Sequence, residues 1–142
     1  MKKLLLLILT IIFASTVLAN SITIDSIESK PVYPGEITFI SIVVENQGDQ
    51  DINDVSISLD LSSAELPFAP INSATQKIID EVEEDDKGLV RFELLALPEA
   101  KPQIYKIPLT IRYEDVTETT LMSIQVISEP SINVGLEEST LV

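Results

Sequence analysis

Apolar and polar residues alternate with a period of two along most of the chain after residue 20. The cleanest run extends from Val55 to Leu61, where every second residue is valine, isoleucine or leucine and the residues between are serine or aspartate. Successive side chains of a β-strand point to opposite faces, so this pattern predicts a strand with one buried and one solvated face. The segment Ile37–Glu45 is apolar on one face and nearly so on the other, which predicts a central strand.

Short segments rich in Pro, Gly, Asn and Asp separate these runs and predict turns. They lie at Pro31–Gly35, Asn46–Asp49, Pro67–Pro70, Asp85–Gly88, Pro98–Pro102 and Glu114–Asp115. Seven strands are expected between them, at about residues 21–28, 36–45, 54–61, 77–83, 88–96, 103–113 and 118–127. No segment after residue 20 has a convincing helical period. The prediction is therefore an all-β fold, a seven-stranded antiparallel β-sandwich of immunoglobulin or fibronectin type III kind.

Three positions in this pattern have a predicted structural role. Pro34-Gly35 predicts a tight turn with Gly35 at positive φ, and Asn46 with Gly48 predicts a similar left-handed turn at the opposite end. Tyr105 follows the turn before the sixth strand, where sandwiches of this type place a tyrosine whose hydroxyl bonds back to the backbone. A ligand-stacking role for Tyr105 is the alternative, and the corner is the preferred interpretation.

The first nineteen residues have the organisation of a secretory signal peptide. Lys2 and Lys3 precede a short apolar run, and small residues then lead to Val17 and Ala19, which predict cleavage between Ala19 and Asn20. The alternative is an uncleaved anchor, but the apolar run is shorter than the roughly 20 residues that span a bilayer. We therefore expect a secreted, extracellular cell-surface protein that meets the membrane only transiently, through its signal peptide.

Composition and charge narrow the function further. The chain has 142 residues, 9 Lys+Arg against 23 Asp+Glu, a formal charge of −14, and neither histidine nor cysteine. Catalysis by Ser-His or Cys-His pairs is thereby excluded, as is imidazole or thiolate metal ligation. The acidic balance argues against nucleic acid as a partner. The sequence predicts no enzyme, no catalytic residue, no cofactor and no metal site.

Several of these motifs together resemble a known family. They are Val32-Tyr33-Pro34-Gly35-Glu36, Val43–Gly48, Val55–Leu59, the Tyr105 corner and Ile111–Asp115. In this combination the chain resembles CARDB-like and archaeal S-layer-type immunoglobulin-like surface domains. The resemblance implies a non-catalytic structural or adhesion module that is usually repeated in tandem, with cell-envelope or surface proteins, or neighbouring repeats, as partners.

The predicted domain organisation has three parts. Residues 1–19 form the signal peptide, residues 20–128 the sandwich, and residues 129–142 a C-terminal tail. The tail resembles the start of a second copy, because Ser131–Val134 parallels Ser21–Ile24.

Two acidic clusters suggest alternatives. Asp49 to Asp54 place side-chain oxygens at alternating positions, with Asp60 where a calcium loop would close. The position that needs glycine carries Asp54, so a solvated loop is preferred over a calcium-dependent domain. The second cluster, Glu81–Asp86, is interpreted as a charged hairpin that discourages edge-to-edge aggregation.

The remaining alternative is carbohydrate binding, for which exposed Tyr33 or Phe68 are the stacking candidates. Phe68 lies in the irregular segment Ser62–Gln76, where Leu66, Phe68 and Ile71 are the first candidates for a partner surface. The competing interpretation has Phe68 closing the open end of the sandwich.

Overall fold

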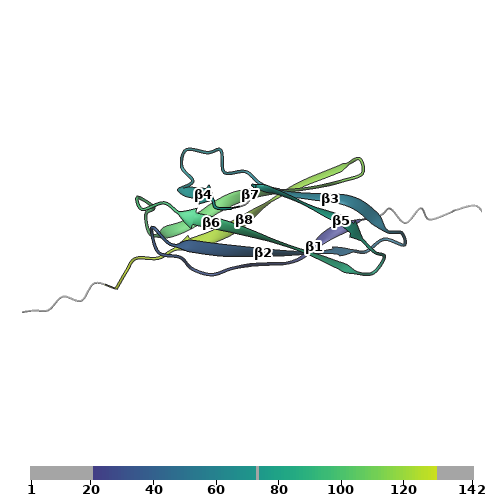
Figure 1. Ribbon diagram of the computed structural model, residues 1–142, viewed down its shortest axis with the longest axis horizontal. Coiled ribbons are helices and arrows are strands. Elements are labelled where there is room, and N and C mark those ends of the chain that lie inside the picture. The colour runs from purple at the N-terminus through teal and green to yellow at the C-terminus, as the bar shows by residue number, and fades with distance from the viewer. Residues whose placement is uncertain (1–20, 73, 131–142) are drawn as a thin grey trace, which may run out of the picture.

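The computed structural model describes residues 21–72 and 74–130, which fold into eight strands without a helix (Figure 1). The strands are β1 (Ile22–Ser29), β2 (Ile37–Asn46), β3 (Ile52–Leu59), β4 (Phe68–Pro70), β5 (Gln76–Val82), β6 (Lys87–Ala96), β7 (Gln103–Tyr113) and β8 (Val116–Val126). The predicted signal peptide and the predicted repeat start at residues 131–134 lie outside the described residues. Within residues 21–72 and 74–130, no helix is long and apolar enough to cross a membrane.

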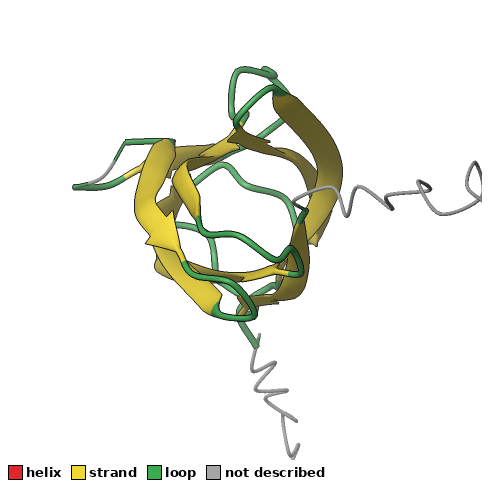
Figure 2. Cartoon of the chain, turned by 90° about the vertical axis from the view of Figure 1, so that its right-hand side faces the viewer, coloured by secondary structure: helices red, strands yellow, loops and turns green. Residues whose placement is uncertain are grey.

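The strands form two four-stranded sheets with the orders β1-β2-β6-β4 and β5-β3-β7-β8. Neighbouring strands are antiparallel throughout, and the view along the molecule shows the two curved sheets enclosing the core (Figure 2). The predicted antiparallel β-sandwich is confirmed, with eight strands in place of seven. The additional strand is β4, which pairs with β6 although it has only three residues. Strand β4 ends in a proline, which cannot continue a ladder, so local sequence gives little signal for it.

The inner face of β2 carries the core, and its outer face is open to solvent. Ile40, Ile42 and Val44 have at most 0% exposure, whereas Ile37 and Phe39 are 46% and 52% exposed. Strand β2 is central in hydrogen-bonding order, between β1 and β6. The expectation that both of its faces are covered is wrong, because no described element packs on the outer side of this sheet.

A left-handed residue reverses the facing of side chains in β3. Asp54 has φ of 55°, and Ile52 and Val55, three positions apart, are both fully buried. Regular alternation would send one of them to solvent. Aspartate tolerates this conformation better than most residues, so the strand begins two residues earlier than predicted and still buries Ile52.

One of the two predicted turns has the expected backbone. Gly35 has φ of 81°, as predicted for the turn after Pro34. Gly48 does not adopt positive φ, so that prediction is wrong. The turn is held instead by buried Asn46, whose Oδ1 accepts a hydrogen bond of 2.9 Å from the Gly48 N–H. The amide of Asn46 donates to the carbonyls of Gln50 and Val82 at 2.8 and 3.0 Å.

The predicted tyrosine corner is confirmed. The hydroxyl of Tyr105 donates to the Lys101 carbonyl at 3.0 Å and accepts from the Lys101 N–H at 3.1 Å. Its ring meets the Phe68 ring edge-to-face, with centroids 5.4 Å apart. The corner therefore closes the turn between β6 and β7 and also fixes β4 against the opposite sheet.

Candidate interaction surfaces

A groove of about 870 Å³ opens on the outer side of the first sheet, where β1 parts from β2. The two strands pair up to Ser29 and Ile40, after which the chain crosses to the other sheet. There Val32 forms a parallel bridge with Val126 at the end of β8. The start of β2 is thus left without β1 beside it, which opens the groove between residues 27–32 and 36–41.

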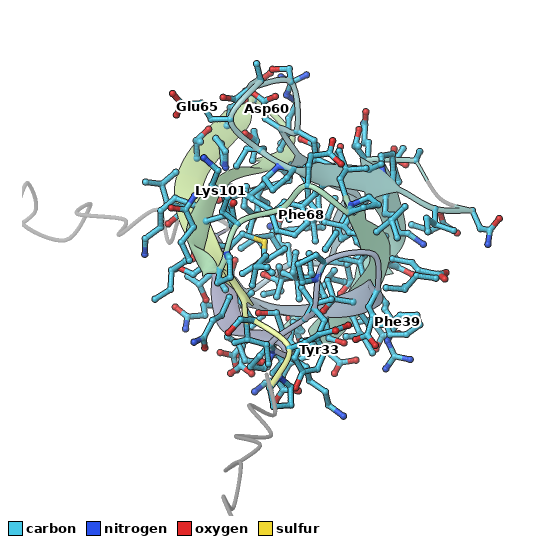
Figure 3. All side chains as sticks on the ribbon, turned by 90° about the vertical axis from the view of Figure 1, so that its left-hand side faces the viewer. Tyr33, Phe39, Asp60, Glu65, Phe68 and Lys101 are labelled. Carbon is cyan, nitrogen blue, oxygen red and sulfur yellow. The ribbon has the colours of Figure 1, made fainter. Side chains whose placement is uncertain are left out.

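The groove has an apolar rim and a mixed-charge lining. Ile37 and Phe39 supply the apolar rim, and Figure 3 shows Phe39 on the outside of the sandwich. Across it, the Thr38 hydroxyl donates to the Lys30 carbonyl at 3.2 Å. The charged side chains are Glu28, Lys30, Glu36 and Arg91. An aromatic ring beside polar groups can stack on a flat apolar surface while its neighbours form hydrogen bonds.

The candidate aromatic residues have different positions from those expected. Phe68 is only 5% exposed and lies over the middle of the sandwich end in Figure 3, in contact with Tyr105. It closes the open end, so the prediction of Phe68 as an exposed stacking or partner residue is wrong. Leu66 and Ile71 are half-buried around it, and Tyr33 is half-buried near the groove. Sequence analysis missed Phe39, because it counted both faces of β2 as interior.

The first acidic cluster does not form a loop around an ion. Residues Ile52–Leu59 are extended in β3, which spaces the acidic residues along a strand. Asp51 Oδ1 accepts the Glu84 N–H at 2.9 Å, and Asp60 Oδ1 accepts the Ser62 N–H and hydroxyl at 2.9 and 2.6 Å. The Ser62 hydrogen bonds lower the pKa of Asp60 below its ordinary value. In the part of the chain that the structure describes, no three acidic side chains gather as metal ligands.

The second acidic cluster is an exposed hairpin between β5 and β6. Asp85 takes φ of 57° at its tip, and residues 83–87 are exposed. Beside it, the Lys87 ammonium lies 2.7 Å from the Asp25 carboxylate on β1. This hydrogen bond raises the pKa of Lys87. The pair lies at the surface, where ion pairs contribute little to stability.

The outer face of the second sheet is rich in hydroxyl groups. Thr110 and Thr119 hydroxyls lie 3.0 Å apart on β7 and β8, and the Gln76 amide donates to the Ser56 hydroxyl at 2.8 Å. Lys106 Nζ donates to the Ser123 hydroxyl at 2.8 Å. These side chains bond to one another across strands, so the face is flat and largely self-satisfied.

Comparison with solved structures places this fold among CARDB domains. The crystal structure of the CARDB domain of the PF1109 protein from Pyrococcus furiosus, in complex with di-metal ions, matches with a TM-score of 0.53 and 11% identity. The match covers 76% of this chain and 89% of that one. The solution structure of the same domain matches with a TM-score of 0.51 and 12% identity, over 76% and 95% of the two chains.

A family 123 glycoside hydrolase from Clostridium perfringens matches with a TM-score of 0.48 and 15% identity, over 69% of this chain and 22% of that one. That similarity is too low to inform on activity. No protein-family model matches the sequence, and no curated protein sequence matches it significantly. The chain is therefore a CARDB-like, immunoglobulin-type β-sandwich, and the resemblance seen in its motifs is confirmed for the fold.

Proposed function

We propose that this protein is a non-catalytic, secreted module of the cell surface with a structural or adhesive role. The observation that carries the proposal is the path of the chain through the sandwich. The described domain is elongated, and residues 21 and 130 lie at opposite ends of its long axis (Figure 1). A domain that the chain enters at one end and leaves at the other extends a series of domains, as a spacer requires.

The core supports the same proposal. Twenty-four apolar residues from both sheets form one buried cluster in the described domain, including Ile40, Phe92 and Ile107. The chain has no cysteine, so this stability does not depend on disulfides or on the redox state of the compartment. Metal binding is not included in the proposal, because the acidic residues of β3 lie spread along a strand.

Export and surface exposure provide the test. The full chain with a C-terminal tag is expected in the envelope fraction, accessible to protease added to intact cells, with its N-terminus at Asn20. The matched control lacks residues 2–19 and is expected to stay inside the cell. A full chain that keeps its first nineteen residues and remains protected inside would contradict the proposal.

Carbohydrate binding is the second candidate, favoured by one observation. Phe39 is 52% exposed at the rim of the groove, which also offers charged and hydroxyl side chains. A sugar could stack on this ring and hydrogen-bond to Ser41 or Arg91. A glycan array probed with the parent and with Phe39→Ala decides it: a glycan lost only in the variant supports the site, and no hit with the parent rejects it.

A further inference from the structure

Strand β8 leaves part of its backbone unpaired along the edge of its sheet. In an antiparallel ladder, alternate residues direct their N–H and C=O groups toward and away from the neighbouring strand. The carbonyls of Ser123 and Gln125 point away from β7, because they accept from the Ser29 hydroxyl at 3.1 Å and the Val32 N–H at 3.0 Å. Odd-numbered residues of β8 therefore face outward.

The first half of this edge has no such cover. Thr117, Thr119 and Leu121 present outward N–H and C=O groups, and no residue in the ranges 21–72 and 74–130 bonds to them. Residues 117–121 are exposed on both faces of the strand, including the inward positions Glu118 and Thr120. Figure 1 shows the end of the β7–β8 hairpin standing clear of the neighbouring strands. A strand placed beside it would not meet the opposite sheet.

The other described edges carry features that hinder strand pairing. Strand β1 has a register shift between Ile24 and Ser26, and β4 has three residues and ends in Pro70. Strand β5 carries Asp80, Glu81 and an inward Lys77, whose Nζ lies 6.0 Å from the centre of the Phe92 ring. Strand β8, in contrast, has eleven residues with Glu118 as its single charge and no proline or glycine.

We propose that the outer edge of β8, residues Val116–Leu121, is a self-association site at which β8 of a second copy pairs antiparallel about a two-fold axis. With the axis at Thr119, Thr117 lies opposite Leu121 of the second copy, and three residue pairs exchange about six backbone hydrogen bonds. The two second sheets then continue as one.

The charge pattern of β8 favours a second copy as the occupant. With the axis at Thr119, Glu118 faces Thr120 of the second copy and the two Glu118 carboxylates are offset from each other. An axis one residue earlier would place Glu118 opposite itself, which is unfavourable. The hydroxyl-rich face would also continue across the interface, with threonine beside threonine at the axis. Because the chain carries a net charge of −14, association should strengthen as salt screens the repulsion between copies.

Sedimentation of the protein purified from expression of the full chain tests this site. We expect a reversible monomer–dimer equilibrium up to about 1 mM protein. Thr119→Pro removes an outward N–H without removing a bond to β7, and should weaken the dimer at least about tenfold. Thr119→Val keeps the N–H and is the matched control, expected to dimerise like the parent. Thermal melting confirms that each variant is folded.

A charge-swap experiment tests the register independently of proline. Thr119→Lys and Thr119→Glu each place two like charges at the axis and should be monomeric, whereas their mixture should form a heterodimer. The proposal is overturned by a parent that is monomeric at all concentrations, by open-ended oligomers, by a dimer that Thr119→Pro leaves intact, or by a mixture that stays monomeric. Capture of a different protein's strand by the monomeric parent would likewise replace it.

Discussion

The side chain of Asn46, buried at the end of β2, donates a 3.0 Å hydrogen bond to the carbonyl of Val82 at the end of β5, and so connects the two sheets. The same side chain bonds to Gly48 and Gln50 in the turn that follows. One amide thus satisfies three backbone groups that would otherwise be buried without partners or left loose, which is costly in a protein interior.

Replacing Asn46 should therefore destabilise the domain. Asn46→Ala removes all three bonds, and we expect a loss of roughly 2–4 kcal/mol in the free energy of unfolding. Urea denaturation followed by circular dichroism measures it. The control is Asn53→Ala, at an exposed position on β3, which should change stability by less than about 0.5 kcal/mol. Equal effects at the two positions would show that the inter-sheet bond has no special weight.

The Tyr105 hydroxyl provides a second test. Tyr105→Phe keeps the ring against Phe68 and removes both bonds to Lys101, so we expect a loss of roughly 1–3 kcal/mol, measured by urea denaturation. Tyr33→Phe removes a hydroxyl from a half-buried ring with no such corner and should be nearly neutral. A neutral Tyr105→Phe would mean that packing of the ring alone closes the turn.

Gly88 allows β5 and β6 to approach closely across the sandwich. A Cβ added at Gly88 would lie 2.7 Å from Ile79 Cδ1 and 3.2 Å from Val82 Cγ2. We expect Gly88→Ala to lower the melting temperature and to cost roughly 1–3 kcal/mol by overpacking. Ile79→Val removes the Cδ1 atom, so the double variant should recover part of the loss. Strictly additive losses would contradict a steric origin.

The two faces of the first sheet should respond very differently to substitution. Phe92 on β6 is fully buried, and Phe92→Ala should cost roughly 3–5 kcal/mol in the free energy of unfolding. Phe39 on β2 is 52% exposed, and Phe39→Ser should cost less than about 1 kcal/mol and raise solubility. Chemical denaturation of both variants checks the contrast. A large loss for Phe39→Ser would indicate that another part of the protein covers this face.

Much of the fold could be predicted from the sequence, because strand alternation and turn chemistry are local. Tyr105, Gly35 and the buried positions Ile57 and Leu59 are where the pattern put them. The candidate surfaces could be predicted less well. Phe68 and Phe39 have the same side chain, yet Phe68 closes the end of the sandwich and Phe39 lies at the rim of the groove. Their difference depends on contacts with residues distant in sequence.

The sequence by itself determined the class of fold, since a period of two assigns alternate residues to opposite faces wherever a strand forms. It also determined the acidic surface and the absence of histidine and cysteine chemistry. Only the tertiary structure decided which face of β2 is covered, that Phe68–Pro70 pairs with β6, and that the start of β8 is left as an open edge. The physical reason is that backbone geometry fixes which side chains share a face, whereas burial of that face depends on where the second sheet lies above it.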